Sequence, residues 1–118
     1  MSQVIYLATH QGPLPAPLFC MFDTEIGGES FTFGIHRSLC SGTHLKLSEV
    51  RTGKGIAAFP YAEAALTDKQ LQSDPGLENA GRTALSALIT QNGEHTVAQV
   101  LIKNRGAAPV LNEPGHSY

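Results

Sequence analysis

The chain has 118 residues, with 8 Lys plus Arg, 10 Asp plus Glu and a formal net charge of −2 when the histidines are neutral. Charged residues make up 15% and apolar residues 42%, a balance too apolar for a wholly disordered chain. The length excludes a Rossmann dehydrogenase or a (β/α)₈ barrel, and the near-neutral charge disfavours a general nucleic-acid binder. The sequence therefore predicts one globular domain of mixed α and β type, without indicating its activity.

Neither a targeting signal nor a membrane helix is evident in the sequence. The apolar run at residues 4–8 is too short for a signal peptide and follows no basic segment. No stretch approaches the roughly 20 apolar residues of a membrane span. We therefore expect a cytoplasmic protein that does not enter a membrane, with Cys20 and Cys40 as free thiols.

The first half of the chain has the composition of β-strands and turns. Residues 3–9 are rich in β-branched and aromatic side chains and predict a first strand. Pro13, Pro15 and Pro17 follow, and because proline lacks an N–H donor we expect an extended connector or a sheet edge there, not a ladder strand. Further strands separated by glycine-containing turns are expected at about 18–23, 30–37, 43–51 and 56–59.

The second half has helical spacing. Pro60 suits the first position of a helix whose apolar face would include Ala62, Ala65, Leu66 and Leu71. Asp74 is predicted to cap a second helix that begins at Pro75, and Asn92-Gly93 to end it with a left-handed cap. The apolar face of this helix would comprise Leu77, Gly81, Ala84, Leu85 and Leu88.

Residues 94–104 fit a helix or a strand, and we favour a helix. The predicted fold is α+β, with an antiparallel sheet of four to five strands in residues 3–59 followed by two to three helices in residues 60–104 packed on one face. We expect a single globular domain over residues 1–104 and an extended or flexible C-terminal tail over residues 105–118.

One local cluster contains residue types that can bind a metal or carry out nucleophilic chemistry. His36, Cys40 and His44 are spaced four residues apart, and Cys20 could complete a tetrahedral zinc site. Cys40 could also act as a nucleophile, with His36 or His44 as its base. The cluster falls in a predicted loop and lacks any Cys-x-x-Cys pair, so we predict no cofactor and keep a metal protein or cysteine-dependent enzyme as the alternative function.

A nucleic-acid interface is the next possibility that the sequence raises. Residues 85–104 could form a helix-turn-helix, with Gly93 in the turn. The expected recognition helix has few basic side chains, and the net charge opposes binding to DNA. The sequence therefore disfavours nucleic acid as a partner.

Protein–protein contacts are the interpretation that we favour. Leu14 and Pro15 lie on a rigid proline-rich segment, which lowers the entropy lost on binding, and Tyr118 offers a terminal aromatic ring. We predict a small non-enzymatic binding or accessory protein, such as an inhibitor or a subunit of a larger bacterial or phage complex. Its partner would be another protein or a second copy in a homo-oligomer.

Overall fold

The computed structural model describes residues 4–9, 11–38, 44–61, 67–107 and 110–112. Its strands are β1 (Val4–Thr9), β2 (Gly12–Pro17), β3 (Cys20–Ile26), β4 (Glu29–Arg37), β5 (His44–Glu49) and β6 (Gly55–Pro60). Its helices are α1 (Asp68–Gln72), α2 (Leu77–Asn92) and α3 (Glu94–Ala107). Strands therefore precede helices, and the predicted α+β fold is confirmed.

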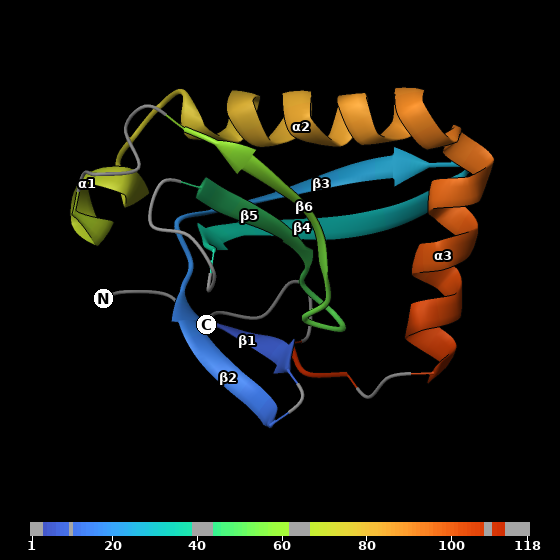
Figure 1. The fold of residues 1–118 in the computed structure, drawn as a ribbon, viewed down its shortest axis with the longest axis horizontal. Helices are drawn as coiled ribbons and strands as arrows, with labels where there is room; N and C mark the ends of the chain where they lie inside the picture. Colours follow the sequence, from blue (N-terminus) through green and yellow to red (C-terminus); the bar gives the residue numbers. More distant parts are fainter. Residues whose placement is uncertain (1–3, 10, 39–43, 62–66, 108–109, 113–118) are drawn as a thin grey trace.

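The main sheet has four antiparallel strands in the order β3-β4-β5-β6, and β1 and β2 form a separate two-stranded ribbon. Figure 1 shows α2 on one side of the sheet, the ribbon on the opposite side and α3 along one end. Adjacent strand residues alternate between the two sides, so each strand of the sheet contributes to both layers of packing.

The larger apolar core lies between the sheet and the helices. Phe33, Ile35 and Leu47 are fully buried on this side of the sheet, and Leu77, Leu85 and Leu101 cover them from the helices. A Cβ atom at Gly81 would lie only 2.4 Å from the Cδ1 atom of Ile35. The glycine in the apolar face of α2 is thus explained by the close approach of the helix backbone to the sheet.

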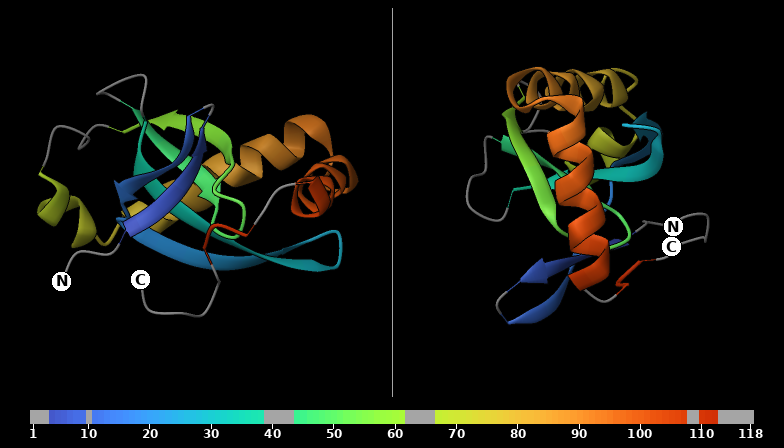
Figure 2. Two further views of the ribbon diagram at one scale, coloured as in Figure 1. Left: turned by 90° about the horizontal axis from the view of Figure 1, so that it is seen from below. Right: turned by 90° about the vertical axis from the view of Figure 1, so that its right-hand side faces the viewer.

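The β1–β2 ribbon packs on the other face of the sheet, as both views in Figure 2 show. Its inner side chains form a smaller core with residues from the segments around it: Ile5, Leu7, Ala16, Leu18 and Val50. The proline segment is at a sheet edge, as one of the two expected alternatives stated, but the expectation that it would stay out of a ladder was wrong, because β2 pairs with β1 along its full length.

The position of the β2 prolines explains why the ladder forms. Tyr6, which faces Pro15, directs both its backbone N–H and its C=O to the side chain of Asn112, at 2.9 Å each. The N–H of Ala8 likewise donates to the carbonyl of Gly53. These β1 residues turn their backbone groups away from β2, so the prolines opposite them turn their nitrogen atoms to the outer edge of β2. No ladder hydrogen bond is lost.

The first predicted helix begins later than expected. Pro60 ends β6, residues 62–66 lie outside the described residues, and α1 starts at Asp68. Thr67 caps α1 in a capping box with Gln70, each side chain accepting a backbone N–H of the other. The capping box therefore decides where this helix starts, and the spacing of the apolar residues does not predict it.

Asp74 is not the N-cap of α2, which begins at Leu77 with Gly76 at the cap position. The carboxylate of Asp74 instead accepts the N–H of Gly76 and the hydroxyl of Tyr61, at 2.9 and 2.6 Å. These hydrogen bonds, first the one from Tyr61, lower the pKa of Asp74. The aspartate therefore fixes the turn before the helix, with Pro75 inside that turn.

The segment after α2 is a helix, as predicted, and it is longer than expected. Gly93 has a positive φ of 88°, but its ψ of 140° is outside the left-handed helical region, so the predicted cap has a different geometry. Helix α3 extends three residues beyond residue 104, to Ala107. The N–H groups of Leu111 and Asn112 donate to the carbonyl of Arg51. The first part of the predicted tail is therefore folded onto the domain.

A buried ion pair holds α3 against the sheet. Glu49 is fully buried, and its carboxylate accepts from Arg105 at 2.7 Å and from Thr52 at 3.0 Å. The guanidinium of Arg105 also lies 4.4 Å above the ring of Phe31 and donates to the carbonyl of Ser30. The end of α3 is thus fixed by charge, stacking and a backbone contact.

Candidate functional site

The sheet separates two of the four residues predicted as an alternative metal site. Cys20 pairs with Ile35 and faces the helices, whereas His36 is the next residue along β4 and faces the ribbon. Burial raises the pKa of the Cys20 thiol, and the carboxylate of Glu78 raises it further. Cys20 is therefore a half-buried thiol at the helix-facing core and does not approach His36.

The remaining predicted residues are placed only in part. His44 begins β5 and Cys40 lies outside the described residues, as does Tyr118. Within the described ranges, no three His, Cys, Asp or Glu side chains are grouped closely enough to hold a metal ion. Leu14 and Pro15 are exposed on β2, as a binding surface would require. The role of Cys40 stays a prediction.

A buried serine–histidine pair is the site that the sequence did not reveal. Ser48 Oγ lies 2.7 Å from Nε2 of His36, and Nδ1 of His36 lies 2.8 Å from the carbonyl oxygen of Arg37. A carbonyl can only accept, so Nδ1 donates to it and Nε2 accepts the hydroxyl proton of Ser48. Burial lowers the pKa of His36; the hydrogen bond to the Arg37 carbonyl opposes this shift in part, and the ammonium of Lys46 adds to it. The imidazole is therefore held neutral.

This pair has the atoms of a general base and a nucleophile, but the ribbon encloses it. His36 and Ser48 are each 1% exposed. The cavity beside them has a volume of about 40 Å³ and is lined by Leu7, Ala8, Lys46, Gly53 and Gly55. That space suits about one water molecule. In this structure the two side chains satisfy each other's hydrogen bonding between β4 and β5. The pair could not be predicted from the sequence, because the register of these two strands brings the residues together.

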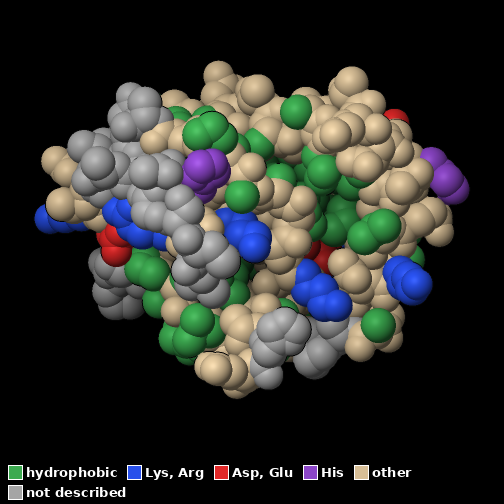
Figure 3. Space-filling view, in the orientation of Figure 1, with side chains coloured by type: hydrophobic (Ala, Val, Ile, Leu, Met, Phe, Trp, Pro, Cys, Tyr) green, Lys and Arg blue, Asp and Glu red, His purple; other side chains and the backbone are tan. Residues whose placement is uncertain are grey.

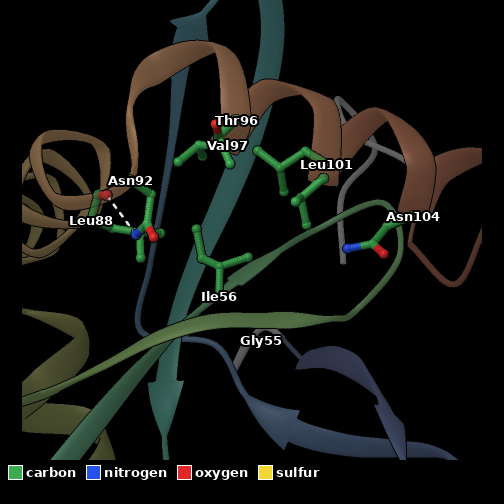
Figure 4. Close-up of a pocket in the computed structure, with 9 residues that line it drawn as sticks. Gly55, Ile56, Leu88, Asn92, Thr96, Val97, Leu101 and Asn104 are labelled. Atoms are coloured by element: carbon green, nitrogen blue, oxygen red, sulfur yellow. Dashed lines mark hydrogen bonds between the residues drawn. The ribbon is translucent and has the colours of Figure 1, made fainter.

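A larger groove lies between β6 and the two long helices. It has a volume of about 250 Å³ and is lined by Gly55, Ile56, Leu88, Asn92, Thr96, Val97, Val100, Leu101 and Asn104. Figure 4 shows Ile56 pointing from β6 toward Val97 and Leu101 on α3, with Asn92 and Asn104 at opposite ends. Figure 3 shows hydrophobic side chains in a hollow on this face. The groove is therefore apolar along its length and carries amides at its ends.

The strand beside this groove has an open edge. The N–H of Ser38 donates to the carbonyl of His44, so His44 directs its backbone groups to β4. Alternate residues of β5 then direct theirs to β6, where Leu45 pairs with Phe59 and Leu47 with Ala57. By the same alternation, the N–H and C=O of Ala58 point away from β5, and no described residue bonds to them. The right-hand view in Figure 2 shows β6 at the border of the sheet.

Comparisons with known proteins give no relatives: no family model, no curated protein and no solved structure matches this chain. Among the residues that the structure describes, no helix has the length and apolar content needed to cross a membrane.

Proposed function

We propose that this protein is a small non-enzymatic binding protein that accepts an extended segment of a partner protein as an additional strand on β6. The observation that carries the proposal is the open edge of β6 directly beside an apolar groove. Strand addition uses this combination, since the backbone edge supplies hydrogen bonds and the adjoining pocket selects a side chain.

The residues of β6 favour such an addition. Natural sheets often protect an edge with charged side chains or proline, and β6 carries no charged residue and has its only proline at its end. Ala58 is exposed and small, so an incoming strand meets no bulky side chain at the hydrogen-bonding position. An apolar side chain of the partner would enter the groove and contact Ile56 and Leu101.

Helix α3 supplies the other wall of the groove. Val100 is 52% exposed although it is apolar, and it lines the groove. Ile102 is 39% exposed on the same helix and does not line the groove. The two residues therefore allow matched substitutions that separate groove binding from a general effect of charge on α3.

Random 12-residue peptides displayed on phage and selected on the purified chain supply the probe for the test. We expect selected peptides, titrated by fluorescence anisotropy, to bind about tenfold more weakly to the Ala58→Pro and Val100→Asp variants. Ala58→Val keeps the N–H donor and Ile102→Asp keeps the groove, so both should stay within about twofold of the unsubstituted chain. Failure to select any peptide, or equal binding by all variants, would refute the proposed function.

The proposal retains the cytoplasm as location and a bacterial or viral source, as the sequence suggested. Self-association would compete with the partner segment for the same edge, because a second copy could pair with β6 in an antiparallel, two-fold symmetric manner. Native mass spectrometry of the chain and of its Ala58→Pro variant distinguishes a homo-oligomer built on β6 from a protein that awaits another partner.

A further inference from the structure

We infer that the partner segment carries a carboxylate at the end that lies over Gly55, where Lys46 and Lys54 would bind it. This inference rests on the proposed strand addition at β6 and specifies the chemistry of the added segment.

The first lysine lies directly over the start of β6. Lys46 pairs with Ala58 across the β5–β6 ladder. A Cβ atom built on Gly55 would lie 2.3 Å from Cε and 2.9 Å from Nζ of Lys46. The ammonium group of Lys46 therefore lies close to the backbone of Gly55, a residue that also lines the apolar groove.

The second lysine reaches the same place from the turn. Lys54 immediately precedes Gly55, and both residues line an open depression of about 480 Å³ together with Ala8 and Thr9. Gly55 thus borders the apolar groove on one side and this depression on the other. A strand added to β6 would pass from one to the other with its end near two ammonium groups.

Neither lysine is neutralised by the part of the chain that the structure describes. The ion pairs there join Arg37 to Asp68, Arg82 to Glu78 and Arg105 to Glu49, and none includes Lys46 or Lys54. Glu49, the nearest acidic residue in the β5 sequence, is buried and held by Arg105. The apolar groove thus adjoins, at Gly55, two lysines that form no ion pair with a described residue.

Charge complementarity therefore favours an apolar segment with a negative end. The carboxylate could belong to an Asp or Glu side chain or to the C-terminus of the partner. Both sources present the same carboxylate group. Amidation of the peptide removes only the C-terminal carboxylate, and replacement of Asp or Glu by its amide removes only the side-chain carboxylate, so the two changes distinguish the sources.

The test compares selected peptides and their neutral counterparts on three forms of the protein. We expect acidic peptides to be enriched on the unsubstituted chain and to bind roughly two- to tenfold more weakly to the Lys46→Gln/Lys54→Gln double variant at low salt. Lys69→Gln on α1 removes one positive charge away from the groove and should leave binding unchanged. The neutral peptides should bind the double variant and the unsubstituted chain equally.

Different results overturn the two proposals. Peptides that need Ala58 and Val100 but show no preference for an acid would refute the lysine site and leave strand addition standing. The lysine site would also be refuted if the Lys46→Gln/Lys54→Gln variant lost as much affinity for the neutral peptides as for the acidic ones. Peptides insensitive to Ala58→Pro would refute both proposals. A dimer that Ala58→Pro dissociates would show that a second copy, not an acidic segment, occupies β6.

Discussion

The strands β2 and β6 have six residues each, yet their outer edges differ in the backbone hydrogen-bonding groups that they offer to a partner. In β2, three prolines at alternate positions remove the donors that would face outward. In β6, Ala58 keeps an outward N–H and C=O beside an apolar groove. A strand can lose every outward donor and still form its ladder, provided that the prolines follow the two-residue period of the sheet.

The inner edge of the ribbon is closed in a different way. The side chain of Asn112 is 2% exposed and bonds to the backbone of Tyr6 and to the carbonyl of Val50. Gly53, with φ of 69°, bonds to Ala8, and a Cβ atom there would lie 2.3 Å from the carbonyl oxygen of Tyr6. The ribbon is therefore blocked on both sides, whereas β6 keeps an open edge at Ala58.

Proline at two neighbouring positions of β6 should have very different effects on stability. Ala57→Pro removes an N–H that faces β5 and should lower the free energy of unfolding by about 3 kcal/mol. Ala58→Pro removes one that faces outward and should change it by less than about 1 kcal/mol. Urea denaturation of both variants measures the difference, and equal losses would show that the backbone alternation assigned to β6 is wrong.

Removal of the Asn112 side chain should be the next largest effect. Asn112→Ala leaves the backbone groups of Tyr6 and the carbonyl of Val50 without their partner, so we expect a loss of about 2–3 kcal/mol in unfolding free energy. Asn104→Ala, at a groove residue, is the matched control and should cost less than about 0.5 kcal/mol. A loss for Asn112→Ala as small as the control would mean that water replaces the amide at this edge.

The histidine beneath the ribbon should make stability depend on pH. Burial lowers the pKa of His36 in the folded state, so below about pH 6.5 the unfolded chain binds more protons than the folded one. The stabilisation is complete above pH 6.5 and is lost as the pH falls toward the lower folded-state pKa. Thermal unfolding between pH 7.5 and 5.5 measures it, and a His36→Gln variant with an unchanged pH dependence would contradict this assignment.

The smallest effect on stability is expected when the blocked edge is opened. Pro15→Ala restores one outward N–H on β2 and should lower the unfolding free energy by less than about 1 kcal/mol, mainly because the unfolded chain gains freedom. Light scattering should instead show increased self-association, since an exposed edge donor favours pairing between copies. Pro60→Ala, at the end of β6, provides the matched proline removal. No increase for Pro15→Ala would indicate that the prolines shape the ribbon without protecting it.

Local sequence patterns account for most of the elements and for few of their boundaries. The alternation of Phe31, Phe33 and Ile35 and the spacing of Leu77, Leu85 and Leu88 predicted β4 and α2. The start of α2 was misplaced because the carboxylate of Asp74 is bound by the hydroxyl of Tyr61, 13 residues away in the sequence. Capping preferences consider only neighbouring residues, so they do not predict that a distant hydroxyl group will bind the capping carboxylate.

The candidate site was the least predictable part. His36 and Ser48 are 12 residues apart and meet because Gly34 pairs with Ser48 and His36 with Lys46, a register set by the packing of both sheet faces. The predicted cluster of His36 and His44 with the cysteines relied on sequence spacing alone, and the sheet places Cys20 on the other face. Groove residues on α2, α3 and β6 have no common motif.

The sequence by itself determined the α+β class, the order of strands before helices and the period-two prolines, because these depend on side-chain periodicity and on the missing proline N–H. Only the tertiary structure decided which strand edge the prolines face, that the edge of β6 stays open at Ala58, and that Lys46 and Lys54 lie beside Gly55, a residue that also lines the apolar groove. Those features depend on strand register and on the packing of layers whose segments are far apart in the sequence, so local sequence patterns do not determine them.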